Sequence, residues 1–547
     1  DLPLLGGLRV LKDNEKIADI MSEHGGLIGR GSLNHSYPHS WRSKAPLVFR
    51  TTPQWFISME TNNLRSTALK SLKETAFFPP QGVNRITKMI EDRPDWCISR
   101  QRAWGVPLGI FVNKKTQEPL RDQEVIDRVV EAFRIEGADA WFQKPAEFFL
   151  GSKYNPDEYE AVTDIADVWF DSGSTHAFVL EEREDLFWPA SLYLEGTDQH
   201  RGWFHSSLLE SCGTRGRAPY DAVLTHGFVL DQQGRKMSKS LGNITAPQSV
   251  INEFGADVLR LWVVGSDYYD DLRIGKEILV RHSDHYRRLR NTLRYLLGGL
   301  NGFEEKEKIE FNQMPELEQW VLHRVAELSI KIEENTKKFN LHDIYTDIHN
   351  FCAVDLSAFY FDIRKDTLYC EELDGKERRA CRTVMDILFN SLTTWLAPIL
   401  CFTSEEAWQS RYNDPENSVH LQTYYKPEKI WFNQLIGKRW TNIRELRSIV
   451  TTAIEEKRKE GLLGSSLQAK VIIHTDENTF NELINLNLPD LFICSDVDMQ
   501  LNKTKKDIFD VKVELASGGK CLRCWKVVQE VNDNAEICNR CKSVIKS

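Results

Sequence analysis

Four cysteines near the end of the chain are arranged in two pairs whose spacing is typical of a metal site. Cys521 and Cys524 form one Cys-x-x-Cys pair, and Cys538 and Cys541 form a second pair after thirteen intervening residues. Two such pairs can place four thiolates around one tetrahedral Zn²⁺ ion. Because cysteine fills all four ligand positions, none remains open for catalysis. The pattern therefore predicts one structural zinc, with four free thiols as the alternative.

A short basic segment, Lys-Met-Ser-Lys-Ser at residues 236–240, has the charge needed to bind a polyphosphate. It follows an apolar run that ends at Leu230 and a turn at residues 231–234, and with Arg235 it places three cations within five residues. Lysine ammonium groups are mobile point charges suited to phosphate, and Gly242 lets the backbone leave the loop tightly. A solvated basic turn is the alternative for a generic segment of this composition.

Two further segments combine carboxylates with indole rings. Residues 169–173 read Trp-Phe-Asp-Ser-Gly, and residues 195–204 read Glu-Gly-Thr-Asp-Gln-His-Arg-Gly-Trp-Phe. A carboxylate can hold an α-ammonium group, which a purely apolar pocket would leave unpaired. Flat indoles supply a large and stiff apolar wall, although simple core packing is the alternative for an isolated tryptophan.

Together these segments resemble the class I aminoacyl-tRNA synthetases, whose signature loop is Lys-Met-Ser-Lys-Ser. Residues 35–39, 50–56 and 95–105 are similar to the branched-chain members of that class. Residues 169–173 and 195–204 resemble the isoleucine enzymes more than the valine or leucine enzymes. The resemblance extends through a helical region to the terminal cysteines, so it covers nearly the whole chain.

The resemblance implies one site for the amino acid and its adenylate. Glu195 is implied to contact the adenylate, while Asp198 and Gln199 help to hold the amino-acid ammonium group. The two tryptophans are implied to form walls of the isoleucine side-chain pocket. The full implied set is Glu195, Gly196, Asp198, Gln199, Trp169 and Trp203.

The ATP part of the implied site lies in the basic loop and in a His-Gly pair. Lys239 is implied to be the principal ATP contact, with Lys236 assisting the leaving pyrophosphate, and His226 and Gly227 lie beside the adenine. The implied reaction is in-line attack of the isoleucine carboxylate on the α-phosphate of ATP, which enters with Mg²⁺, and then transfer to tRNA(Ile). Positioning and charge neutralisation dominate such chemistry, and the family also edits valine.

Two parts of the family pattern are not found in this sequence. The His-x-Gly-His signature of the first nucleotide-binding half is absent, and His35 and His39 have Pro38 between them, which favours a loop or packing role over a helical metal site. Of the editing domain we expect only the C-terminal edge, at residues 1–43. We therefore expect a C-terminal fragment that does not activate isoleucine alone. A valine enzyme and an inactive synthetase-derived tRNA-binding protein are the alternatives.

The elements that position these residues are expected to form four regions after residue 43. Residues 44–308 are expected to be the second half of a Rossmann-type α/β catalytic core, with an insert at about 113–165. A helical anticodon-binding bundle follows at 309–455, then a small α/β junction module at 456–515 and the zinc-binding tail at 516–547.

Local patterns predict particular helices and strands within these regions. Residues 14–24 read as a helix, and the apolar stripe that starts at Leu317 predicts another. Thr403 with Glu406 is expected to cap a further helix. Apolar runs predict strands at 47–49, 192–194, 222–224, 471–473, 491–493 and 511–513.

The composition limits the class of protein. The chain has 547 residues, a net charge of −10 and no apolar run long enough to span a membrane. The charge argues against a globally basic nucleic-acid coat but allows tRNA binding through local patches. The other seven cysteines are scattered singly, as in a reducing cytosol. We expect a cytoplasmic protein, and class membership suggests a monomer.

Overall fold

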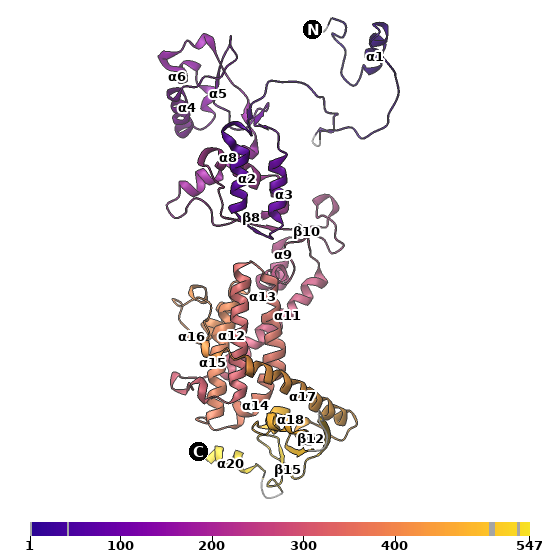
Figure 1. The fold of residues 1–547 in the computed structure, drawn as a ribbon, viewed down its shortest axis with the longest axis vertical. Helices are drawn as coiled ribbons and strands as arrows, with labels where there is room; N and C mark the ends of the chain where they lie inside the picture. Colours follow the sequence, from indigo (N-terminus) through magenta and orange to yellow (C-terminus); the bar gives the residue numbers. More distant parts are fainter. Residues whose placement is uncertain (1–2, 41–42, 503–508, 533–535, 547) are drawn as a thin grey trace. The chain divides into compact units, whose positions relative to one another are not determined.

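The computed structural model describes residues 3–40, 43–502, 509–532 and 536–546. It divides into two compact units, each of which is described by itself (Figure 1). The first unit contains residues 1–75, 84–190 and 200–221. The second contains residues 76–83, 191–199 and 222–547.

The first unit is built from short strands and helices. Helix α8 packs against both α7 and α2. The predicted helix at 14–24 is confirmed as α1. The elements are α1 (Asn14–Glu23), β1 (Phe56–Ile57), α2 (Leu64–Glu74), α3 (Gly82–Glu91, which begins in the second unit), β3 (Trp96–Cys97), β4 (Ser99–Arg100), β7 (Ile165–Ala166), α7 (Val168–Gly173) and α8 (Trp203–Arg215).

The expected insert has a hydrophobic core of its own. Strands β5 (Phe111–Asn113) and β6 (Tyr159–Ala161) pair antiparallel, and Phe111 packs against Trp141 with ring centroids 4.8 Å apart. Three helices complete this core: α4 (Gln123–Glu136), α5 (Ala140–Gln143) and α6 (Ala146–Leu150).

A three-stranded parallel sheet of the second unit has the order β2-β9-β8. Its strands are β2 (Ala76–Phe78), β8 (Tyr193–Gly196) and β9 (Ala222–His226), so the predictions at 192–194 and 222–224 are confirmed. The prediction at 47–49 is wrong. These three residues form no strand and are exposed, because an apolar triplet becomes a strand only where a neighbouring strand pairs with it.

Two short strands and three helices continue the second unit from this sheet into a helical bundle. They are β10 (Val229–Leu230), α9 (Pro247–Phe254), α10 (Ala256–Val264), β11 (Leu272–Arg273) and α11 (Lys276–Gly299). The bundle helices that follow are α12 (Glu316–Lys337), α13 (Leu341–Asn350), a π-helical segment (Phe351–Tyr360), α14 (Phe361–Cys370), α15 (Lys376–Leu396), α16 (Cys401–Tyr412) and α17 (Gln434–Lys459).

The bundle is organised around one large apolar core. The predicted stripe on α12 is buried throughout, and Trp395 and Trp440 are almost fully enclosed. The predicted cap at Thr403 is wrong, because α16 begins at Cys401. The Thr403 amide and hydroxyl instead donate to the carboxylate of Asp257 on α10, at 2.8 and 2.6 Å. A carboxylate distant in sequence thus accepts the hydrogen bonds of amides in the first turn of α16, which have no partner within the helix.

A buried ion pair joins α12 to α14. Arg364 donates to both carboxylate oxygens of Glu318, at 2.7 and 2.5 Å, and the side chains are 6% and 0% exposed. Arg364→Met is expected to lower the free energy of unfolding by about 3 kcal/mol, because it leaves a buried carboxylate without its partner. Urea unfolding of the purified variant measures this.

The matched control is Lys365→Met, which removes a more exposed pair with Asp362. It is expected to cost about 0–1 kcal/mol. Equal effects of the two substitutions would contradict a special role for the buried pair.

The small α/β module follows the bundle and carries the C-terminal knuckle. Its sheet has the order β13-β12-β14, with β12 and β13 parallel and β12 and β14 antiparallel. The predictions at 471–473 and 511–513 are confirmed. The prediction at 491–493 is wrong, because Leu491 and Phe492 end a short helix and Ile493 is its C-cap, with a φ of 53°. The elements are β12 (Ala469–Thr475), α18 (Glu477–Leu483), α19 (Leu488–Phe492), β13 (Asp496–Leu501), β14 (Phe509–Leu515), β15 (Gly519–Lys520), β16 (Val527–Val528) and α20 (Asn539–Lys546).

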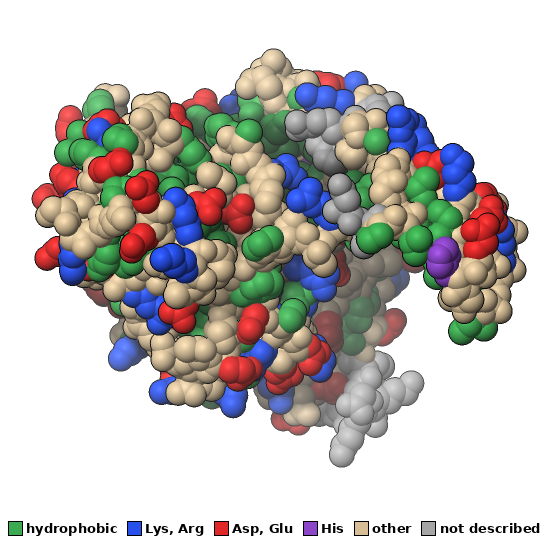
Figure 2. Space-filling model, turned by 90° about the horizontal axis from the view of Figure 1, so that it is seen from above, with side chains coloured by type: hydrophobic (Ala, Val, Ile, Leu, Met, Phe, Trp, Pro, Cys, Tyr) green, Lys and Arg blue, Asp and Glu red, His purple; other side chains and the backbone are tan. Residues whose placement is uncertain are grey.

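Charges and apolar groups are mixed on the surface. Figure 2 shows acidic and basic side chains interspersed with apolar ones on the visible face. Within the described ranges, no helix combines the length and the apolar character that crossing a bilayer would require.

Candidate functional site

The basic loop has the predicted order of strand, turn and loop. Strand β10 ends at Leu230, and Gly234 in the following turn has a φ of 80°. A single 3₁₀ turn, Lys239–Leu241, closes the loop, and Gly242 leaves it with a φ of 64°. Lys236 and Lys239 are exposed, and neither forms a salt bridge with another described residue. These two lysines thus have ammonium groups available for an anionic ligand.

Two residues that sequence reasoning missed hold this loop. Asp231 is buried, and its carboxylate accepts hydrogen bonds from Asn243 Nδ2 at 2.9 Å and from Arg235 Nε at 2.8 Å. These bonds, that of Asn243 foremost, lower the pKa of Asp231 to about 2. Arg235 is therefore held within the loop and differs from the two lysines. A short Asp-x-x-Gly turn was the available signal.

The predicted adenylate residues lie at the carboxyl ends of adjacent parallel strands. Gly196 at the end of β8 is in register with His226 at the end of β9. A Cβ on Gly196 would lie 2.7 Å from Asp198 Oδ1, so glycine allows this carboxylate to fold back over the strand end. Gln199 Nε2 donates to Asp198 Oδ2 at 3.1 Å, and Glu195 is exposed. The carboxyl edge of a parallel sheet is where open α/β folds bind ligands.

At the residues predicted to bind adenine, His226 and Gly227, the backbone lies close to the backbone of Asp270. A Cβ on Gly227 would lie 2.2 Å from the Asp270 carbonyl group, so only glycine fits there. His226 Nδ1 donates to the Gly227 carbonyl at 2.8 Å. This bond requires a proton on His226 Nδ1, so in the neutral ring Nε2 is the acceptor.

The two predicted pocket tryptophans belong to the first unit. Trp169 lies in the first turn of α7 and is 42% exposed, while Trp203 begins α8 and is half-buried. Trp203 Nε1 donates to the Ser172 carbonyl at 3.0 Å, which fixes its indole against α7. The other predicted substrate residues lie in the second unit, so the composition of the pocket stays a prediction.

Beneath α7 lies a buried carboxyl group that the sequence analysis also missed. A Cβ on Gly173 would lie 2.1 Å from Glu210 Oε1, so α7 packs directly over this side chain on α8. Glu210 Oε1 has no hydrogen-bond partner among the described residues. Burial, with a contribution from the Asp171 carboxylate, raises the pKa of Glu210 from 4.5 to about 9. Glu210 is therefore neutral at pH 7.

The raised pKa of Glu210 makes the α7–α8 packing sensitive to pH. The protonated Glu210 side chain contributes to the stability of this packing fully below the unfolded pKa of 4.5. This contribution is lost as the pH rises towards 9, because the Glu210 carboxyl releases its proton at a lower pH in the unfolded chain than in the folded one. Glu210→Gln is therefore expected to protect α8 amides from hydrogen exchange better than the wild type at pH 8, with convergence near pH 5. Glu184→Gln, at an exposed position, is the control. A wild-type protection that does not vary with pH would contradict this.

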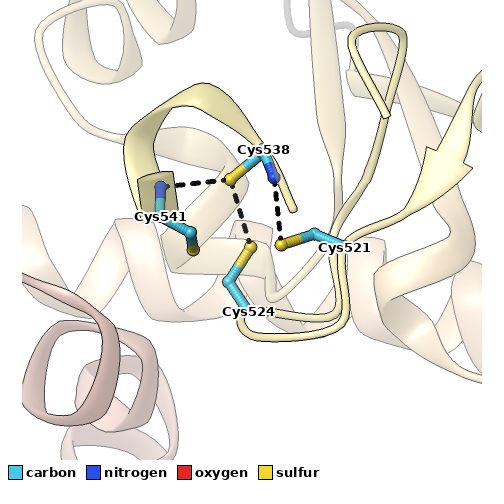
Figure 3. Close-up of side chains that lie close together, drawn as sticks. All are labelled: Cys521, Cys524, Cys538 and Cys541. Atoms are coloured by element: carbon cyan, nitrogen blue, oxygen red, sulfur yellow. Dashed lines mark hydrogen bonds between the residues drawn. The ribbon is translucent and has the colours of Figure 1, made fainter. Parts of the chain in front are cut away.

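The four cysteines are brought together as predicted (Figure 3). Their sulfur atoms all lie within 4.8 Å of one another, and the Cys524 and Cys538 sulfurs are 3.8 Å apart. Four thiolates at about 2.3 Å from one tetrahedral Zn²⁺ ion would have sulfur–sulfur distances of about 3.8 Å. A disulfide would require about 2.05 Å.

Backbone groups support the cysteine cluster. The Cys538 amide donates to Cys521 Sγ at 3.3 Å, and the Cys541 amide donates to Cys538 Sγ at 3.5 Å. All four cysteines are buried, and no carboxylate or histidine among the described residues joins the group. The donor set therefore fits a structural zinc ion with no open coordination position.

Comparisons with known proteins agree with this arrangement of parts. Residues 11–275 match the family described as tRNA synthetases class I (I, L, M and V), and residues 318–473 match the anticodon-binding domain of tRNA ligase. Residues 518–544 match the zinc finger found in FPG and IleRS. The chain is 50% identical over its whole length to the isoleucine–tRNA ligase of Gluconobacter oxydans, and 49% identical over 96% of its length to that of Pelagibacter ubique.

The chain belongs to the isoleucine–tRNA ligase family. The predicted order of a synthetase catalytic core, a helical anticodon-binding domain and a four-cysteine knuckle is confirmed. This synthetase chain spans 58% of the length of both relatives. The roles of its individual site residues stay predictions.

Proposed function

We propose that this synthetase chain forms part of an enzyme that attaches isoleucine to tRNA(Ile) through an isoleucyl-adenylate and that also edits valine. The observation that carries the proposal is the second-unit edge where the ends of β8 and β9 bring Gly196 and His226 together. The same unit holds a loop with two exposed lysines. A carboxylate-bearing strand end and a polyphosphate-binding loop within one unit suit an adenylating enzyme.

In this proposal the residues act by binding and by neutralising charge. Lys239 and Lys236 hold the ATP phosphates, which enter with Mg²⁺, and stabilise the charge on the departing pyrophosphate. His226 and Gly227 lie beside the adenine. Asp198 and Gln199 hold the amino-acid ammonium group, and Glu195 contacts the adenylate. The indoles of Trp169 and Trp203 form walls of the side-chain pocket.

We further propose that the helical bundle and the knuckle bind tRNA(Ile). The match of residues 318–473 to an anticodon-binding domain supports this. Zinc, when bound by the four cysteines, would fix the fold of the knuckle and supply no catalysis. A cytoplasmic and monomeric enzyme remains our expectation.

The test is amino-acid-dependent ATP–pyrophosphate exchange by the full-length enzyme of which this chain is proposed to form part, with isoleucine, valine and leucine compared. We expect the highest kcat/KM with isoleucine and exchange with valine lower by about two orders of magnitude, a ratio already known for enzymes of this family. Preference for valine would favour the valine enzyme instead. Absence of exchange with all three, together with retained tRNA binding, would favour the inactive tRNA-binding protein.

A further inference from the structure

The basic loop is closed into a ring by two side chains at its ends. Asp231 follows β10, and Asn243 lies twelve residues later, yet Asn243 Nδ2 donates to Asp231 Oδ2 at 2.9 Å. The two residues enclose both loop lysines between them. The hydrogen bond between Asp231 and Asn243 therefore restrains the backbone conformation of the segment that carries the two lysines.

Asn243 also contacts the loop backbone on both sides of Met237. Its Oδ1 accepts from the Ser238 amide at 2.9 Å, and its Nδ2 donates to the Lys236 carbonyl at 3.3 Å. A single side-chain amide supplies the acceptor and the donors that these bonds require. Replacement of Asn243 by alanine would remove all of these hydrogen bonds, and replacement by aspartate would remove those in which the side chain donates.

Asp231 is the residue to which both the turn and Asn243 are hydrogen-bonded. Its Oδ1 accepts from the amides of Gln233 and Arg235, at 3.0 and 2.8 Å, in addition to the bonds of its Oδ2. Bonds to the turn on one side and to Asn243 on the other join β10 to the loop. Met237 adds an apolar anchor, since its side chain packs against the core around Leu224 and Leu272.

We propose that Asn243, held by Asp231, is a positioning residue that sets the backbone at Lys236 and Ser238 so that the loop lysines reach the ATP phosphates. This inference rests on the proposed function for its catalytic consequence. If the loop backbone were mobile, the ammonium groups of the lysines would be displaced from the phosphates. Small displacements from a productive geometry lower the reaction rate by large factors.

The first test is Asn243→Ala in isoleucine-dependent ATP–pyrophosphate exchange by the full-length enzyme of which this chain is proposed to form part. We expect kcat to fall by about 10- to 100-fold, with the KM for isoleucine changed by less than about threefold, since the amino acid binds elsewhere. Asn252→Ala is the matched control, because Asn252 is exposed on α9 and bonds only to Gln248 among the described residues. A kcat within about threefold of the wild type would overturn the proposal.

A second variant, Asn243→Asp, separates positioning from simple loss of structure. It places a second carboxylate against Asp231, so at pH 8 we expect a loss at least as large as that of Asn243→Ala. As the pH falls through the raised pKa of this carboxyl pair, one carboxyl takes up a proton and can again donate to the other. We therefore expect its activity relative to the wild type to recover as the pH falls. A ratio that does not vary with pH would count against the proposal.

A measurement that does not depend on enzymatic activity tests the role of Asn243 independently of the proposed function. The Ser238 amide is expected to exchange hydrogen about tenfold faster in Asn243→Ala than in the wild type, because it loses its acceptor. Wild-type protein without isoleucine-dependent exchange would refute the proposed function while leaving this measurement valid. Unchanged protection of Ser238 would overturn the role of Asn243, whatever the activity.

Discussion

Removal of the metal from the four-cysteine cluster is expected to unfold the C-terminal knuckle. The purified protein should contain one zinc ion per chain, and a chelator that removes it should abolish amide protection around Cys521 and Cys541. The apparent free energy of zinc binding to such sites is of the order of 10 kcal/mol, which exceeds what this small apolar cluster can supply alone. Metal analysis and hydrogen exchange measure both effects.

The loss should also reach the helical bundle, because charged contacts join the two. Arg540 on α20 donates to both carboxylate oxygens of Asp366 and to Glu371, at 2.5 to 2.9 Å. Lys526 also forms an ion pair at 2.5 Å with Asp490 on α19, which joins the knuckle to the small α/β module. Without zinc these cations lose their fixed positions, so we expect weaker protection at the end of α14 as well.

Cys521→Ser should reproduce the effect of the chelator, whereas Cys401→Ser, outside the cluster, should retain the metal. Protein that contains no stoichiometric zinc yet keeps the knuckle folded would refute the structural role. Retention of zinc by Cys521→Ser would show that fewer than four thiolates suffice.

Replacement of Lys239 is expected to produce the largest loss of catalytic rate. Lys239→Ala should lower kcat for isoleucine-dependent ATP–pyrophosphate exchange by about 10²- to 10³-fold, because one preorganised charge on the phosphates is lost at the transition state. Lys236→Ala should show a smaller loss. The KM for isoleucine should change little, since neither lysine is proposed to touch the amino acid.

The control is Lys459→Ala, which removes an exposed lysine near the end of α17 and should leave exchange unchanged. Lys239→Arg tests whether the charge alone suffices, and partial recovery is expected because the guanidinium has a different shape. A Lys239→Ala protein with wild-type kcat would remove this lysine from the proposed mechanism. Arg235 is no substitute, because Asp231 already binds it.

The predicted site residues fall into two groups when they are compared with the structure. The cysteines could be identified from spacing alone, since a four-thiolate site depends on two short local turns, and the structure places all four sulfurs together. The pocket tryptophans could be identified only by resemblance. Their side-chain environment depends on α7 and α8, which lie thirty residues apart in sequence.

Several features depended on contacts that no local pattern contains. Asp257 caps α16 across more than 140 residues, and the apolar triplet at 47–49 pairs with no strand in the described part of the chain. Leu491 and Phe492 end a helix and Ile493 is its C-cap, although the composition of this triplet favours a strand. The side chain of Asn487 accepts from the Asp490 amide and caps the start of α19. Burial of Glu210 likewise arises only when α7 packs over α8.

By itself the sequence determined the chemistry available to this protein: four thiolates for one zinc, two lysines for a polyphosphate and a carboxylate-rich strand end. These are short patterns whose meaning depends on residue type and spacing. The tertiary structure alone decided which cations remain available, because the Asp231 carboxylate binds the Arg235 guanidinium and forms no ion pair with the ammonium group of Lys236 or Lys239 among the described residues. Such choices follow from packing and hydrogen bonding in three dimensions, which a linear pattern does not contain.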